Sequence, residues 1–346
     1  MRKIVRDKFN KLLVIRTDRI GDVVLTLPVA GALHRCYPQA EIVFMVQPYV
    51  RDIVKGHKYI ARIILDRGER GRQFNGLVRR LRAEKFDAAL LLHPTLRLAL
   101  LMKLAGIPVR IGTAYRLYSF LFSCRVREHR KVSTRHEVEY NLSLVKALGC
   151  DDTQVQFDLP VSEAARVDID TLYRALNLDV NMPLIVIHPG SLASALDWPM
   201  SHFTELVGRL AADPVQLLIT GSPDEAAITE KLAGAAENAR SLAGQLDLLR
   251  LSALLERVDL CVANSTGPLH MAAALGTDVV GFYPPVRSMR PRRWGPWGQQ
   301  GSTLVPEGFC LSCSKNKCER FNCMAEITVE SAYQLIQKKI SFARTQ

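Results

Sequence analysis

Two successive series of alternating strand and helix patterns restrict the fold of this 346-residue chain more than any other feature. In the first half, short runs of aliphatic and β-branched residues alternate with amphipathic helical segments. Strands separated by helices of roughly 10 to 15 residues predict a parallel sheet with right-handed crossovers. The expected strands are 11–17, 41–48, 62–68, 87–94 and 109–115, and the expected helices are 21–38, 50–56, 74–86, 96–106 and 136–149.

The second half repeats this scheme. Its expected strands are 183–190, 214–225, 259–267 and 277–285, and its expected helices are 201–213, 246–258, 268–276 and 326–343. The sequence therefore predicts an α/β protein with two Rossmann-like parallel-sheet domains facing a central cleft. We expect an N-terminal domain at 1–165, a linker at 166–182, a C-terminal domain at 183–325 and a C-terminal helix at 326–346.

The chain is strongly basic, with a formal net charge of +12 at pH 7. Its arginines are scattered, and we find no zinc finger, RNP-type aromatic motif or clear helix-turn-helix. We therefore expect no nucleic-acid partner, and favour an anionic small molecule or an anionic lipid surface. No apolar run reaches the roughly 18 to 20 residues that span a bilayer. Only LLVI follows the basic N-terminus before Arg16, so we expect a cytoplasmic protein without a secretory signal.

Polar or glycine-rich loops follow four of the expected strands, at the sheet edges where α/β proteins bind ligands. NSTGPLH at 264–270 places Pro268 at the start of a helix, whose free N–H groups favour an anion such as a diphosphate. The alternative is a well-capped structural helix. TGSPDE at 220–225 offers Asp224 and Glu225 to ribose hydroxyls, although acids also begin helices for capping reasons. Neither a G-x-G-x-x-G turn nor a Walker A loop is present, which argues against a dehydrogenase and a P-loop kinase.

The eight cysteines form two sets. Cys36, Cys124, Cys150 and Cys261 are isolated, and we expect buried thiols there because the chain lacks a recognisable secretory signal. The others form a compact string that suits a soft metal such as zinc or iron, with reduced thiols packing a C-terminal loop as the alternative. These four residues are Cys310, Cys313, Cys318 and Cys323.

The order of the motifs resembles that of the bacterial heptosyltransferases of glycosyltransferase family 9, which build the inner core of lipopolysaccharide. The motifs are RTDRIGDVVLTLP at 16–28, HPGSLASALDWP at 188–199, NSTGPLHMAAALG at 264–276, RRWGPWG at 292–298 and the cysteine string. The resemblance implies a GT-B fold with the active site between the two domains, in which the C-terminal helix at 326–346 packs back on the N-terminal domain. The N-terminal domain would bind the acceptor and the C-terminal domain the nucleotide-sugar, with no metal required for catalysis. Any zinc or iron at the cysteines would be structural.

By this resemblance, Asp22 matches the carboxylate of the family's Gly-Asp pair, the general base that takes the proton of the acceptor hydroxyl. The alternative for Asp22 is a helix N-cap or first-turn acid. Arg16 and Arg19 are close enough in sequence to keep Asp22 ionised or to meet the acceptor. The arginines expected to bind acceptor carboxylates and phosphates are Arg16, Arg19, Arg51, Arg97 and Arg116.

The resemblance also assigns the donor site. Backbone of 266–269 would meet the diphosphate, 188–191 would form the opposing wall, and Leu246 would contact adenine unless it is an ordinary core leucine. The expected donor-binding residues are His188, Gly190, Ser191, Gly221, Glu225, Leu246, Ser265, Thr266, Gly267, Pro268, Leu269 and His270. Many family members carry an aspartate where Ser265 stands and a lysine where Leu196 stands. Candidates to replace that lysine are Arg287, Arg290, Arg292 and Arg293.

The resulting hypothesis is an inverting glycosyltransferase, peripheral to the inner membrane. It would move heptose from ADP-heptose to an anionic lipid-linked oligosaccharide of the lipopolysaccharide inner core. One alternative is the same chemistry with another nucleotide-sugar or a protein acceptor. The other is a catalytically silent scaffold that binds sugar-nucleotides, motivated by Leu196.

Overall fold

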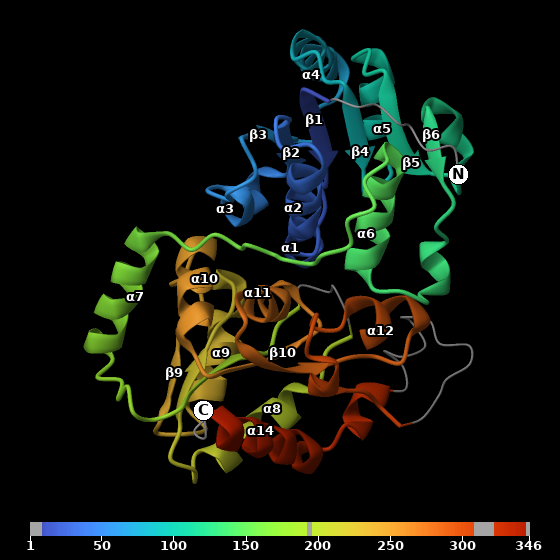
Figure 1. Ribbon diagram of the computed structural model, residues 1–346. Helices are drawn as coiled ribbons and strands as arrows, with labels where there is room; N and C mark the ends of the chain where they lie inside the picture. Colours follow the sequence, from blue (N-terminus) through green and yellow to red (C-terminus); the bar gives the residue numbers. More distant parts are fainter. Residues whose placement is uncertain (1–8, 192–195, 308–321, 344–346) are drawn as a thin grey trace. The chain divides into compact units, whose positions relative to one another are not determined.

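The computed structural model of the chain describes residues 9–191, 196–307 and 322–343, and these form two compact units. Within the described residues, unit 1 comprises 9–130 and 135–160, and unit 2 comprises 131–134 and the chain from 161 onward. Each unit has its own six-stranded parallel sheet (Figure 1). Two α/β units with parallel sheets confirm the predicted fold class.

The sheet of unit 1 has the strand order β3-β2-β1-β4-β5-β6. Its strands are β1 (Lys11–Ile15), β2 (Glu41–Val46), β3 (Arg62–Leu65), β4 (Ala88–Leu91), β5 (Val109–Thr113) and β6 (Cys124–Val126). Its helices are α1 (Ile20–Val24), α2 (Leu27–Cys36), α3 (Arg51–Val54), α4 (Gly71–Ala83), α5 (Leu96–Leu104) and α6 (Glu137–Val145). The short edge strand β6 follows the 3-10 helix η2 (Leu117–Leu121), and the sequence pattern did not predict it. β1 is buried on both faces, as expected of a central parallel strand.

The helix predicted at 21–38 is in fact two helices, α1 and α2, that break at Leu25 and Thr26. Pro28 has no N–H to give to the carbonyl of Val24, and its ring would collide with that carbonyl in a continuous helix. The Thr26 hydroxyl instead bonds the Asp22 carbonyl at 2.8 Å, and Asn141 Nδ2 bonds the Leu25 carbonyl at 3.0 Å. The break lets α6 reach the turn that carries Asp22, and α2 and α6 pack side by side (Figure 1).

The sheet of unit 2 has the order β12-β11-β10-β7-β8-β9. Its strands are β7 (Leu184–His188), β8 (Gln216–Ile219), β9 (Ala239–Ser241), β10 (Leu260–Asn264), β11 (Asp278–Phe282) and β12 (Thr303–Leu304). Its α-helices are α7 (Glu163–Ala175), α8 (Met200–Leu210), α9 (Ala226–Ala233), α10 (Leu248–Arg257), α11 (Gly267–Leu275), α12 (Pro291–Trp294) and α14 (Val329–Ala343). Helix α7 contacts α10, so most of the segment predicted as a linker belongs to this unit.

The C-terminal helix α14 packs on α8 and β11 of unit 2. Ala332 and Ile336 are fully buried in the same apolar cluster as Phe203 of α8. The Trp198 indole N–H donates to the carbonyl of Ile327 at 2.8 Å and fixes the entry to this helix. The apolar face of this helix is therefore used within unit 2, and the expectation that the helix packs back on the N-terminal domain stays a prediction.

Cys36 and Cys150 form a disulfide that joins the C-terminal end of α2 to the segment after α6. The prediction of isolated buried thiols is therefore wrong for these two residues. The sequence could not reveal the pair, because its members are 114 residues apart and become neighbours only when α2 packs on α6. Cys124 and Cys261 are buried thiols, as predicted, and burial raises the pKa of both.

Candidate functional site

Asp22 lies in the first turn of α1, just beyond the carboxyl end of β1. The apolar run LLVI forms the centre of the sheet, and the chain leaves it at Arg16 and enters α1 through extended backbone at Arg19. The side chain of Asp22 is 17% exposed, while Gly21 beside it is buried. The sequence motif thus places a carboxylate at the edge of the sheet, with limited access to solvent.

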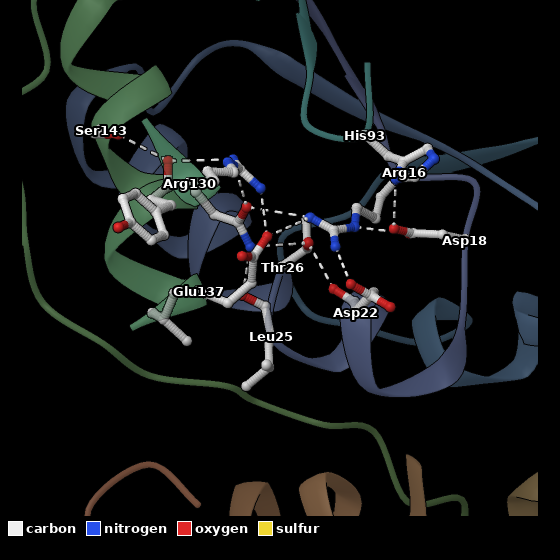
Figure 2. A network of polar contacts seen from close by, with 12 residues as sticks. Arg16, Asp18, Asp22, Leu25, Thr26, His93, Arg130, Glu137 and Ser143 are labelled. Carbon is white, nitrogen blue, oxygen red and sulfur yellow. Dashed lines mark hydrogen bonds and ion pairs between the residues drawn. The ribbon is translucent and has the colours of Figure 1, made fainter. Parts of the chain in front are cut away.

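The guanidinium of Arg16 contacts three carboxylates, and its side chain is only 2% exposed. Nη2 donates to Asp22, Nε donates to Asp18 at 2.7 Å, and Nη1 donates to Glu137 at 3.0 Å (Figure 2). Asp18 in turn accepts an ion-pair contact from His93 Nδ1 at 3.0 Å. Arg16 was expected either to keep Asp22 ionised or to meet the acceptor, and its contact with Asp22 supports the first role.

Glu137 is the fully buried member of this network. It begins α6, and its Oε1 receives both Arg16 and Arg130. Asn141, one turn later, accepts from the same two arginines at 3.3 Å and 3.2 Å. Helix α6 therefore holds Arg16 through a guanidinium nitrogen other than the one that contacts Asp22 (Figure 2). We name Arg16, Asp18, Asp22, Arg130 and Glu137 the Arg16 network.

Burial raises the pKa of Asp22 to about 6, because its charged form is poorly solvated. The positive charge of Arg16 opposes this shift, whereas the negative charges of Asp18 and Glu137 add to it. For Asp18 burial also raises the pKa, but Arg16 and His93 outweigh burial and lower it overall. The two carboxylates that share Arg16 thus have pKa values shifted in opposite directions, and Asp22 is the more basic one. A raised pKa is what a carboxylate needs to act as a general base near neutral pH.

A pocket of about 510 Å³ opens beside this network at the carboxyl ends of β1 to β4. Its polar lining includes Gln47, His93 and Thr95, and the ion pair between the buried Asp66 and the half-buried Arg97. Asp66 is 3% exposed and accepts from Arg97 Nη2 and from the Gly68 N–H at 3.1 Å. The lining thus combines a cationic guanidinium, a carboxylate and neutral polar groups, which suits an anionic ligand that carries hydroxyls.

The predicted acceptor arginines separate into different environments. Arg97 lines the pocket, and Arg16 is buried against Asp22. Arg19, Arg51 and Arg116 are exposed and are not among the residues that line it. The structure therefore brings Asp22, Arg16 and Arg97 to one edge of unit 1 and leaves the other three on its surface.

In unit 2, Gly190 and Glu225 are in direct contact. A Cβ atom on Gly190 would overlap the Glu225 carboxylate, so any larger residue there would displace that carboxylate. That carboxylate accepts from the N–H of Ser222 at 2.7 Å and from its hydroxyl at 2.9 Å, which closes the turn after Gly221. His188 bonds Thr220 at 3.0 Å, and burial lowers its pKa to about 4, so its imidazole is neutral near pH 7. The loops after β7 and β8 thus form one surface.

Asn264 links the loop after β7 to the end of β10. Its side chain is fully buried, accepts from the Trp198 N–H at 2.9 Å and donates to the Pro189 carbonyl at 2.5 Å. Helix α11 begins three residues further on, at Gly267, and the Thr266 hydroxyl makes no capping hydrogen bond to it. Within the described part of the chain, the buried hydroxyl of Ser191 has no hydrogen-bond partner. Unsatisfied donors therefore accompany the loop after β7 and the N-terminus of α11.

The remaining residues predicted to bind the donor are buried or partly buried around the starts of α10 and α11. Pro268, Leu269 and His270 are buried in the first turns of α11, Ser265 precedes them and is partly buried, and Leu246 is half-buried before α10. Leu196 is 7% exposed and belongs to the apolar core of unit 2. Arg290 and Arg292 donate to the carbonyls of Pro285 and Thr134, both at 2.7 Å.

The metal site predicted at the cysteine string lies outside the described residues, because Cys310, Cys313 and Cys318 are not among them. Within the described residues, no group of three or more possible metal ligands occurs.

The sequence did not single out Glu137, Arg130, Asn141 or Asn264. A glutamate that begins a helix carries the same signal as an ordinary capping acid, and 121 residues separate Glu137 from Arg16. His93 ends the run LLLHP of an expected strand, and that position at the sheet edge is the one signal that favours a functional role.

The comparisons with known proteins agree with this geometry. The model of glycosyltransferase family 9 (heptosyltransferase) matches residues 75–324. The chain is 28% identical to lipopolysaccharide heptosyltransferase 2 of Escherichia coli over 80% of this chain and 83% of that protein. It superposes on a family 9 glycosyltransferase of Veillonella parvula with a TM-score of 0.82, at 20% identity and covering 97% and 98% of the two chains. For the E. coli heptosyltransferase WaaC with ADP the TM-score is 0.72, at 20% identity and covering 96% and 98%.

Proposed function

The chain belongs to glycosyltransferase family 9 and is a glycosyltransferase, and we propose that it transfers heptose from ADP-heptose to a lipid-linked acceptor of the lipopolysaccharide inner core. The relatives support this choice, since heptosyltransferases of that pathway align with most of the chain. The observation that carries it is the Arg16 network, which holds the basic carboxylate of Asp22 and contacts the pocket residue His93 through Asp18.

In this proposal Asp22 removes the proton of the attacking acceptor hydroxyl. The deprotonated oxygen forms the new bond to the anomeric carbon of the heptose as the bond to the ADP oxygen breaks, which inverts the anomeric centre. ADP leaves with the electron pair of the broken bond. Arg16 limits the cost of keeping Asp22 charged, while Asp18 and Glu137 keep it basic enough to accept the proton.

The acceptor would occupy the pocket of unit 1. Arg97 is positioned for a carboxylate or phosphate group, and Gln47, His93 and Thr95 for sugar hydroxyls. Arg19, Arg51 and Arg116 would meet more distant anionic groups of a large acceptor, because they are exposed on the same unit. The formal charge of +12 suits such a ligand.

The donor would bind unit 2. The N-terminus of α11 offers backbone N–H groups and a positive dipole end to the diphosphate, and the Glu225 carboxylate suits ribose hydroxyls. A structurally similar heptosyltransferase was solved with ADP, which supports an adenine nucleotide. This chemistry requires no metal, and zinc or iron at Cys310, Cys313, Cys318 and Cys323 would be structural.

We further place the protein at the cytoplasmic face of the inner membrane, because a lipid-linked acceptor would be found there. Among the described residues, no helix is long and apolar enough to cross a bilayer. Contact with the membrane would therefore involve the surface of the protein.

Donor titration combined with turnover tests the proposal. Calorimetry with ADP, UDP and GDP should give measurable affinity for ADP, at least about tenfold tighter than for the other two. ADP-heptose should then be consumed only with an inner-core acceptor. Preference for UDP would overturn the heptose assignment, and ADP-heptose binding without turnover on any core acceptor would favour a silent scaffold.

A further inference from the structure

Exposed aromatic and aliphatic side chains of unit 1 gather on the loops around its pocket. Leu117 is fully exposed, Phe120 is 70% exposed, and Leu96, which adjoins the pocket residues Thr95 and Arg97, is 50% exposed. Tyr118, beside Leu117, donates its hydroxyl to the carbonyl of Pro94 at 2.6 Å. The hydrogen bond of Tyr118 therefore ties the segment that carries Leu117 and Phe120 to the residue before Thr95 in the pocket wall.

The 3-10 helix η2 (Leu117–Leu121) presents two of these side chains together. Residues three apart are eclipsed in a 3-10 helix, so Leu117 and Phe120 lie on one side and Tyr118 and Leu121 on the other. Leu121 is 8% exposed in the core of unit 1, and Tyr118 packs against that core. Leu117 and Phe120 must consequently face away from the core.

This outward arrangement is held by the fold. The Ser119 hydroxyl donates to the Thr113 carbonyl at 2.7 Å and accepts from the Arg116 N–H at 3.1 Å. Arg110 Nε donates to the Leu121 carbonyl at 2.9 Å, so both ends of η2 are tied to β5. An apolar pair that is rigidly exposed gains nothing from folding, which calls for a partner outside the chain.

The apolar pair has basic surroundings. Arg116 precedes it, and Arg125 and Arg127 of the following segment are also exposed. The rings of Tyr115 and His129 lie 4.5 Å apart between centroids, which brings the end of that segment beside the start of η2. From 114 to 127 the chain has no acidic residue. Apolar side chains within a cationic rim match the interface of an anionic bilayer.

We propose that Leu117 and Phe120 insert into the surface of an anionic membrane while Arg116, Arg125 and Arg127 contact lipid phosphates. This inference deepens the proposed function by naming the surface that brings the pocket to a lipid-linked acceptor. The docking itself does not depend on which sugar is transferred. A second copy of this chain is the other occupant that such an apolar pair could have, and the test separates the two.

The test is co-sedimentation of the full chain with vesicles. One set contains equal parts of phosphatidylethanolamine and phosphatidylglycerol, and the other contains phosphatidylcholine alone. The L117S/F120S double variant should bind the anionic vesicles at least about tenfold more weakly than the parent. The matched control is V167S/V180S, which removes two exposed apolar side chains of unit 2 and should bind like the parent.

Equal binding by the L117S/F120S variant, or no preference of the parent for anionic vesicles, would overturn the proposal. So would a parent dimer that the double variant converts to a monomer, because the pair would then serve a second copy. With ADP-heptose, L117S/F120S should retain turnover on a lipid-free acceptor fragment and lose it on the vesicle-embedded acceptor. Failure of the proposed function would abolish turnover on both acceptors and leave the vesicle result intact.

Discussion

Arg16 donates to Asp22 through only one of its three guanidinium nitrogens, Nη2. Nε and Nη1 are engaged by Asp18 and Glu137, so the positive charge is divided among three carboxylates. A one-to-one ion pair would make Asp22 strongly acidic and a poor base. Burial, together with the negative charges of Asp18 and Glu137, instead outweighs the shared Arg16 and raises the pKa of Asp22.

Asp22→Asn should reduce transfer by about 10² to 10⁴-fold, the usual contribution of a positioned general base. ADP affinity should stay within about twofold, because Asp22 lies in unit 1 and the proposed donor site in unit 2. The matched control is Asp52→Asn, which alters another first-turn acid, in α3, and should keep full activity. Steady-state kinetics and calorimetry check both expectations; normal turnover by the Asp22→Asn variant would remove Asp22 as the base.

The rate should depend on pH through the ionisation of Asp22. Only the carboxylate accepts a proton, so kcat/KM should fall as pH drops through about 6. Glu137→Gln removes a negative charge that raises the pKa of Asp22, and the acid limb should shift to lower pH. Glu163→Gln, which changes an exposed first-turn acid of α7, should leave the profile unchanged. A Glu137→Gln variant that is folded by circular dichroism and has an unshifted limb would contradict this link.

Stability should show the same ionisation with a definite sign. The folded-state pKa of Asp22, about 6, exceeds the ordinary aspartate value of 3.8, so the folded protein holds this proton more tightly than the unfolded chain. The parent therefore loses stability as pH rises from about 4 to beyond 6. Asp22→Asn lacks this loss and should unfold at a higher denaturant concentration than the parent at pH 8, with the advantage shrinking toward pH 4. A variant less stable at pH 8 would show that Arg16 needs the third carboxylate.

Gly190→Ala should weaken ADP binding by at least about tenfold, since the new methyl group displaces the Glu225 carboxylate. The matched control is Gly208→Ala within α8, where the nearest atom that the new methyl group would meet is 4.0 Å away. That substitution should keep ADP affinity and should not lower stability, because alanine favours helices. Unchanged ADP affinity in the Gly190→Ala variant would show that the Glu225 turn does not form the donor site.

The sequence predicted the sheets well and the network poorly, for physical reasons. Periodicity identified the central strands, where burial on both faces demands long apolar runs such as LLVI. It missed β6, β9 and β12, whose two or three residues at or next to a sheet edge leave no periodic signal. It also missed the break between α1 and α2, although Pro28 was a local signal for it.

For the site, local motifs located Asp22 and the start of α11, because each follows a strand directly. Glu137, one of the residues that raise the pKa of Asp22, comes from α6, far along the chain, and only tertiary packing brings it to Arg16. The position of Leu196 suggested a missing cation, yet its side chain packs in the apolar core. A sequence position says which residue is present, but not the direction in which it points.

The strand order has a consequence for how this protein can vary. From β1 the chain builds outward through β2 and β3, then returns to β4 and builds outward on the other side. The loops after β1 and β4 therefore diverge, and Thr17 and His93 border the opening between them. The second sheet has the same reversal between β7 and β10, where Pro189 and Asn264 meet. Topology thus fixes where each ligand is received, so substitutions in these loops change what is bound without moving the place of binding.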